Sequence, residues 1–138
     1  MIAVKSVINK IRKSGLTISF AESCSGGNIA AEVIKISGVS DIFMGGVVTY
    51  SDEAKIDVLK LTKQDINKFG VVSENIAFLM AKNSKELFKT SLSLATTGNV
   101  GPLSTDNRSK VGEIYIHQLL IYYQSVSYTH LRAHETFA

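Results

Sequence analysis

A segment near the N-terminus, AESCSGG at residues 21–27, concentrates side chains that could do chemistry. Ser23 and the cysteine and serine after it are potential nucleophiles, and Gly26 and Gly27 follow directly. Because glycine lacks a Cβ, backbone N–H groups there can approach a ligand closely. At a helix start such N–H groups are unpaired and favour an anion, a phosphate or an oxyanion. An ordinary strand-to-helix turn with a serine cap is the alternative, and the residues alone leave both open.

A serine nucleophile needs a base, and histidine is the usual one. The chain has three histidines. His117 lies within an apolar predicted strand, where a structural role is expected, and His130 and His134 lie in the last nine residues. We therefore do not expect a Ser-His-Asp triad.

Lys55 is the second candidate base, because a buried or crowded lysine loses pKa and can accept a proton near neutral pH. It stands five residues after Tyr50, which could relay a proton or hold the amine by a hydrogen bond. The alternative for Lys55 is a solvated helix lysine. Cys24 is a rival nucleophile, since a thiol at a helix N-terminus can have a lowered pKa. Cysteine is also often just a small buried hydrophobic residue.

The composition indicates one globular domain. The 138 residues are 45% hydrophobic and 20% charged, with a net charge of +3. Basic residues are scattered, which gives no indication of nucleic-acid binding. One cysteine suits a reducing compartment, lysines interrupt any signal-like segment, and no apolar run could span a bilayer. We therefore expect a cytoplasmic protein with no membrane partner, and the spacing of Cys, His and acidic residues predicts no metal site.

Apolar periodicity predicts strands that alternate with helices. The helices are expected at residues 2–11, before Gly15, and at 26–36, 53–61 (capped by Asp52) and 74–89 (capped by Ser73). The strands are expected at residues 16–21, 41–50, 90–98 and 113–123, with a polar loop at 101–112. Gly45 and Gly46 suggest a bulge or a close backbone approach. The alternation indicates a three-layer α/β/α sandwich.

Ligands in such folds collect at the carboxyl ends of strands. Three predicted strands end in small polar residues: the segment after residue 21, Thr49–Ser51 and Thr96–Gly98. We expect the site there.

Five segments resemble, in order, the CinA C-terminal domain family, also called nicotinamide-nucleotide amidase. The likeness runs from about Leu16 to Ile116. The segments are AESCSGG (21–27), GGVVTYSDEAK (45–55), GVVSENIA (70–77), TGNVGP (97–102) and KVGEIYI (110–116). The resemblance implies an α/β/α fold and hydrolysis of the carboxamide of nicotinamide mononucleotide to nicotinic acid mononucleotide and ammonia. It implies no metal and no cofactor.

The resemblance also implies roles for individual residues. The serine of the A-E-S-C motif, the nucleophile, is Ser23. The tyrosine and lysine of the Y-S-x-E-A-K motif fall on Tyr50 and Lys55 and would take and return its proton.

Substrate-binding positions follow from the same motifs. Thr97, Gly98 and Gly101 of the T-G-x-x-G-P loop would lie against the substrate, a small nucleotide. N–H groups near Gly26 and Gly27, or near Gly98, would hold the oxyanion or the phosphate. A homodimer is compatible with so small an enzyme. The rival functions are a nucleotide-binding module without amidase activity, a serine amidohydrolase for another amide, and a cysteine hydrolase.

The end of the chain departs from the family. The family domain continues after the VGEIYI strand through a further strand to a final helix, with a substrate-site arginine before that helix. Residues 126–138, VSYTHLRAHETFA, show neither the strand nor the helix. We interpret residues 1–125 as an incomplete family domain and residues 126–138 as an artefactual, non-family tail. A natural short variant with a divergent tail is the alternative.

Overall fold

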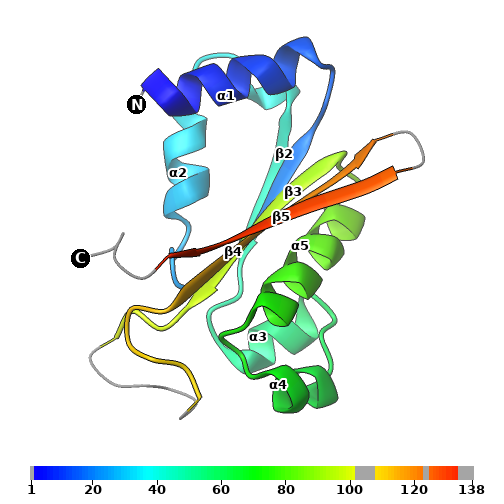
Figure 1. Ribbon diagram of the computed structural model, residues 1–138. Helices are drawn as coiled ribbons and strands as arrows, with labels where there is room; N and C mark the ends of the chain where they lie inside the picture. The colour runs from blue at the N-terminus through cyan, green and yellow to red at the C-terminus, as the bar shows by residue number, and fades with distance from the viewer. Residues whose placement is uncertain (1, 102–107, 123–124, 134–138) are drawn as a thin grey trace.

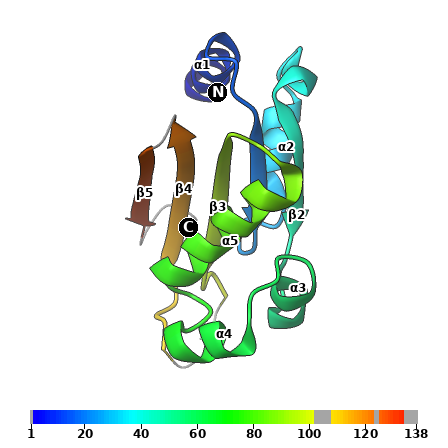
Figure 2. The same ribbon diagram turned by 90° about the vertical axis from the view of Figure 1, so that its right-hand side faces the viewer.

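The computed structural model describes residues 2–101, 108–122 and 125–133. A mixed sheet of order β2-β1-β3-β4-β5 lies between helices on its two faces, with α1 and α2 on one side and α5 on the other (Figures 1 and 2). The strands are β1 (Ile18–Glu22), β2 (Phe43–Val48), β3 (Leu92–Gly98), β4 (Ile114–Tyr122) and β5 (Ser125–Ala133). The helices are α1 (Ile2–Lys13), α2 (Asn28–Ile34), the 3-10 turn η1 (Val39–Asp41), α3 (Asp52–Asp57), α4 (Lys63–Phe69) and α5 (Glu74–Phe88). The predicted three-layer fold is confirmed.

One side of the sheet is parallel and the other side is antiparallel. β1 pairs in parallel with β2 on one side and with β3 on the other. β4 runs antiparallel to β3, and β5 runs antiparallel to β4. The carboxyl ends of β1, β2 and β3 therefore meet at one edge, where α3 and α4 lie (Figure 2).

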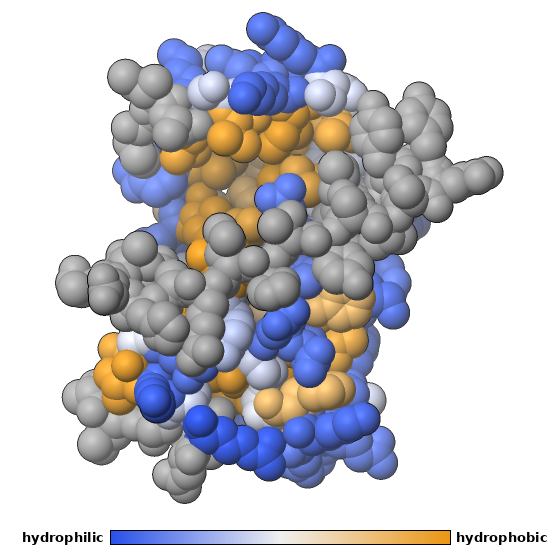
Figure 3. All heavy atoms as spheres, viewed as in Figure 1, coloured by the Kyte–Doolittle hydropathy of each residue, from blue (hydrophilic) through white to orange (hydrophobic). Residues whose placement is uncertain are grey.

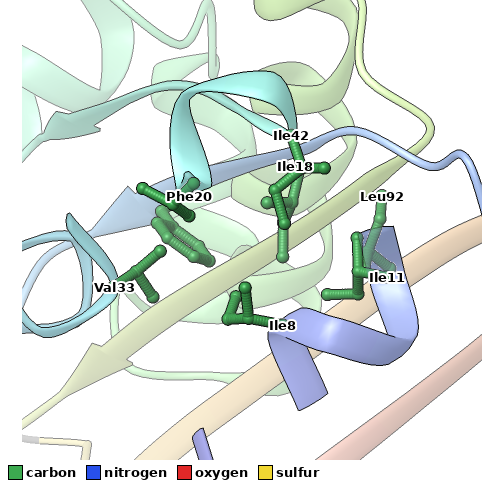
Figure 4. Packing of buried hydrophobic residues seen from close by; sticks show 8 residues of the cluster. Ile8, Ile11, Ile18, Phe20, Val33, Ile42 and Leu92 are labelled. Atoms are coloured by element: carbon green, nitrogen blue, oxygen red, sulfur yellow. The ribbon is translucent and has the colours of Figure 1, made fainter. Parts of the chain in front are cut away.

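One buried cluster joins α1 and α2 to the sheet. Its side chains come from both helices, from β1 and β3 and from the segment before β2 (Figure 4). Its fully and largely buried members include Ile8, Ile11, Ile18, Phe20, Val33, Ile42 and Leu92. The helical spacing of Val4, Ile8 and Ile11 lets α1 present one apolar stripe to the sheet.

The cluster is not closed on the side of β3 and β4. A hollow of about 390 Å³ lies beside α1, lined mostly by aliphatic side chains such as Val7, Ile29 and Leu94. Hydrophobic atoms are visible in this hollow beneath α1 in the space-filling view (Figure 3).

A second buried cluster lies on the other face and positions the segment that carries Lys55. Ile76 and Met80 of α5 are fully buried and pack with Leu59 and Leu61, which follow α3, and with the sheet residue Ala95. Because Leu59 and Leu61 anchor the chain just after α3, this cluster fixes α3 against the carboxyl edge of the sheet.

The local predictions at Ser73 and at Gly45 and Gly46 are confirmed. Ser73 caps α5 as predicted, accepting a hydrogen bond from the Ile76 N–H. The register of β1 and β2 skips one residue, Met44, next to Gly45, so the predicted bulge is present. An added Cβ at Gly46 would lie 3.2 Å from the Phe20 carbonyl oxygen, which confirms the close approach.

One helix prediction was wrong in detail, and one helix was not predicted. The cap of α3 is Ser51, which accepts from the Ala54 N–H, and Asp52 is instead the first helical residue. The helix α4 was not predicted, although Thr62 and Asp65 form a capping box whose spacing is visible in the sequence.

The tail prediction requires a correction. Residues Ser125–Ala133 form β5, so the expectation that residues 126–138 contain no strand is wrong for residues 126–133. Only two residues separate the ends of β4 and β5, and pairing satisfies backbone groups along the β4 edge that would otherwise lie open. Residues 134–138 lie outside the described residues, and the interpretation of the tail as a non-family segment stays a prediction. Within the part of the chain that the structure describes, no helix is long and apolar enough to cross a membrane.

We expect Ile76→Ala to lower the free energy of unfolding by about 2–5 kcal/mol, because it empties a fully buried site beneath the α3 segment. The matched control is Leu87→Ala on the same helix, where the side chain is half exposed, and a loss within about 1 kcal/mol is expected. Urea unfolding of both variants checks this. Equal losses would show that α5 does not anchor the segment as described.

Candidate active site

Polar turns after three parallel strands come together at the carboxyl edge of the sheet. Ser23 follows β1 directly, Thr49 and Tyr50 follow β2, and Thr97 and Gly98 end β3. The Ser23 N–H donates to the Thr96 carbonyl oxygen at 3.1 Å, and the Thr49 N–H donates to the Glu22 carbonyl oxygen at 2.9 Å. The three strand ends are therefore joined by backbone hydrogen bonds just where the candidate residues lie.

The structure brings Lys55 against Ser23. Lys55 Nζ lies 3.0 Å from Ser23 Oγ. The amine also donates to the Thr49 carbonyl oxygen at 2.8 Å and to the Tyr50 carbonyl oxygen at 3.2 Å. Lys55 is only 1% exposed and Ser23 is 6% exposed. The alternative of a solvated helix lysine is therefore wrong.

The arrangement suits a lysine that acts as a base. Two carbonyl oxygens hold two N–H bonds of the amine, and the third direction points at Ser23 Oγ. In the neutral amine that direction is the lone pair, which can accept the serine proton.

Burial lowers the pKa of Lys55 below its ordinary value of 10.5. The negative charge of Asp52, and secondarily Cys24, raises it again by a smaller amount. Desolvation disfavours the charged amine, so the net effect is to make the neutral base available at lower pH.

The carboxylate in the turn has a structural role. Glu22 is 2% exposed. Its two oxygens accept hydrogen bonds from the N–H groups of Ile29 at 2.9 Å and of Ala30 at 3.0 Å. These N–H groups belong to the first turn of α2, so Glu22 caps the helix from the preceding strand. Two of the N–H groups that were expected to hold an anion at the start of α2 therefore bind the protein's own carboxylate.

Other N–H groups of the turn are still available. Within the described residues, no oxygen accepts from the N–H groups of Cys24 and Ser25, which follow Ser23 directly. The N–H groups of Gly26 and Asn28 donate to carbonyl oxygens inside the turn. The donors nearest in sequence to the candidate nucleophile thus have no oxygen acceptor in the described residues, although both act on the Cys24 thiol.

A cavity of about 200 Å³ opens beside Ser23 and Lys55. Its described lining combines residues from all three strand ends with residues before α5. They are Ser23, Tyr50, Asp52, Lys55, Val71, Val72, Thr97 and Gly98. Asp52, Val71 and Val72 were not predicted as site residues, although all three lie in the quoted motifs at residues 45–55 and 70–77.

Tyr50 lies at the cavity in a different way from the one expected. Its backbone carbonyl accepts from Lys55, whereas the residue as a whole is 69% exposed. The expectation that the tyrosine side chain holds the amine is therefore corrected: the main chain does so. Tyr50 remains among the residues that line the cavity.

The predicted binding residues separate into two groups. Thr97 and Gly98 line the cavity, but the Thr97 hydroxyl donates to the Val71 carbonyl oxygen at 2.8 Å. A Cβ added to Gly98 would lie 2.7 Å from Ile114 Cγ1 and 3.0 Å from Cys24 Sγ, so packing alone requires glycine there. Gly26, Gly27 and Gly101 are outside the described lining of the cavity.

Both glycines of the turn adopt positive φ angles. Gly26 has φ +60° and Gly27 has φ +94°. Their backbone conformation, which side-chain-bearing residues rarely adopt, accounts for the glycine pair without a bound anion.

Two rival groups fit a chemical role less well. Burial raises the pKa of the Cys24 thiol, although Thr96, the N–H groups of Cys24 and Ser25, and Lys55 act in the opposite direction. His117 is 2% exposed and packs edge-to-face on Phe78 of α5, with ring centroids 5.1 Å apart. Its expected structural role fits this packing. In the described part of the chain, no three His, Cys, Asp or Glu side chains gather as a metal site would need.

Comparison with known proteins yields one family. A family model described as "CinA C-terminal domain" matches residues 2–132. A "CinA-like protein" of Flavobacterium psychrophilum is 48% identical over 101 residues, which are 73% of this chain and 24% of that protein. A "CinA-like protein" of Kosmotoga olearia is 43% identical over 110 residues, 80% of this chain and 27% of that protein. The chain therefore spans about a quarter of the length of these curated relatives.

Solved structures show the same relationship. The crystal structure of "competence/damage inducible protein CihA" from Agrobacterium tumefaciens superposes with a TM-score of 0.87 and 28% identity. The superposition covers 96% of this chain and 79% of that chain.

We expect Glu22→Gln to lower the free energy of unfolding by about 1–3 kcal/mol, since its amide NH₂ would face an N–H donor inside a buried site. The control is Glu32→Gln on α2, whose surface ion pair with Lys35 should contribute less than about 1 kcal/mol. Thermal unfolding followed by circular dichroism gives both values. A neutral Glu22→Gln variant would contradict the capping role.

Proposed function

The chain belongs to the CinA C-terminal domain family, and on this basis we propose that it is a serine amidase acting on nicotinamide mononucleotide. The observation that carries the proposal is the 3.0 Å contact of Lys55 Nζ with Ser23 Oγ, made by an amine whose other directions are held by carbonyl oxygens. The products would be nicotinic acid mononucleotide and ammonia.

In the first half-reaction Ser23 Oγ attacks the carboxamide carbon while neutral Lys55 takes the hydroxyl proton. The N–H groups of Cys24 and Ser25, from which no oxygen of the described residues accepts, would donate to the oxyanion that forms on the carbonyl oxygen. Lys55 then gives its proton to the amide nitrogen. The C–N bond breaks, ammonia leaves, and an ester to Ser23 Oγ remains.

Water completes the cycle. It attacks the ester carbon as Lys55 accepts one of its protons, and the C–O bond to Ser23 breaks. The proton returns from Lys55 to Ser23 Oγ, and the carboxylic acid product leaves. Each proton taken by Lys55 is therefore given back, and neither step requires a cofactor.

Removal of either partner should abolish turnover. We expect Ser23→Ala and Lys55→Met to reduce ammonia release from nicotinamide mononucleotide by about a thousandfold or more, because nucleophile and base act together. Lys63→Met is the matched control, an exposed lysine on α4, and should keep full activity. Circular dichroism establishes that each variant is folded.

The same assay tests the rival functions. A folded protein that binds the nucleotide but releases no ammonia would favour a binding module. Release from other amides but not from this nucleotide would favour another amidohydrolase. Activity that survives Ser23→Ala and is lost in Cys24→Ala would favour a cysteine hydrolase.

The rate should rise with pH as Lys55 loses its proton, with a midpoint below 10.5, because burial lowers its pKa. Asp52→Asn removes the charge that raises this pKa, so the midpoint should move to lower pH. Glu53→Gln, the neighbouring carboxylate outside the described cavity lining, should leave the midpoint nearly unchanged. Profiles of kcat/KM against pH measure this, and a midpoint that rises in Asp52→Asn would contradict the charge assignment.

A further inference from the structure

The charges that line the cavity are unbalanced when Lys55 acts as a base. Asp52 and Lys55 are the carboxylate and the amine in its described lining. Asp52 begins α3 and Lys55 comes three residues later, a spacing that places both on one face of the helix. Once Lys55 is neutral, the Asp52 carboxylate gives the cavity a negative charge.

An aromatic residue lines the same cavity. Tyr50 is 69% exposed, so its ring is accessible to a ligand. The face of an aromatic ring attracts cations, and it also stacks against other flat rings. A carboxylate and an aromatic side chain beside one cavity are together suited to a flat cation.

We propose that Asp52 is a specificity-determining residue that makes the cavity prefer a cationic pyridinium carboxamide over a neutral pyridine carboxamide. The proposal rests on the proposed amidase function, since a pyridine ring bonded through its nitrogen to ribose carries a positive charge, whereas free nicotinamide carries none. The valines of the lining, Val71 and Val72, supply apolar contact for either ring and do not distinguish them.

Binding of such a cation also acts on Lys55. In the free protein the Asp52 charge favours the protonated amine. A cation placed beside Asp52 offsets that charge and favours the neutral amine, which is the state that accepts the serine proton. A cationic ligand would thus lower the pKa of Lys55 and increase the fraction of neutral amine, whereas a neutral ring would not.

The experiment compares two ligands that differ in charge, N1-methylnicotinamide and nicotinamide, in the Ser23→Ala protein, where hydrolysis does not interfere. Calorimetry gives both dissociation constants, and their ratio is the cation preference. We expect Asp52→Asn in the same background to reduce this ratio by about fivefold, the effect of roughly 1 kcal/mol from a partly exposed charge pair. Glu53→Gln is the matched control and should leave the ratio unchanged.

Salt supplies a second measurement. The preference should weaken between low and high ionic strength in the Ser23→Ala protein but not in the Asp52→Asn variant, because exposed charges are screened. A ratio that survives Asp52→Asn, or equal affinities for the two ligands, would overturn the inference. Binding of neither ligand would overturn it as well. Ammonia release by the protein with Ser23 decides the proposed function separately.

Discussion

The buried amine of Lys55 is the interaction on which the rest of the site depends. An amine that is 1% exposed loses nearly all its contact with water, and the Thr49 and Tyr50 carbonyl oxygens and Ser23 Oγ take the place of that water. This requirement fixes the end of β2, the start of α3 and the turn after β1 relative to one another. It also determines the chemistry, because the same desolvation that makes the charged amine costly makes the neutral amine accessible.

The polar side chains at the end of β1 and in the turn after it make different contacts. Glu22 turns toward α2 and closes the first turn of that helix, so its charge is used inside the fold. Ser25 hydrogen-bonds the Thr96 hydroxyl at 2.7 Å and ties the turn to β3. Ser23 alone of the three contacts the lysine. The N–H groups beside it have no oxygen acceptor within the described residues, so under the proposed amidase function they would be the donors to the oxyanion.

The sequence predicted the alternation of strands and helices, the cap at Ser73 and the gathering of small polar segments at the strand ends, because these depend on local periodicity and on a general property of parallel sheets. It did not predict how individual groups are used. The carbonyl of Tyr50 rather than its hydroxyl holds Lys55. For Cys24 the sequence left a reactive and a buried thiol both open, and burial, which raises the pKa of the thiol, is the largest influence on that pKa. Such roles depend on which way a side chain turns once the layers pack. β5 was also missed, because its pairing is decided by the open edge of β4.

The position of β1 between β2 and β3 has a consequence for how the protein acquires its site. Ser23 and Lys55 are 32 residues apart, and the Ser23 N–H bonds Thr96 across 73 residues. Each parallel pairing joins strands that are separated by a long crossover segment. Closing that segment costs chain entropy before the contacts between the strands can stabilise the pair. The site is therefore complete only when β2 and β3 have both joined β1, and no short fragment of the chain carries it. Activity at this site would then report that the parallel half of the sheet has formed.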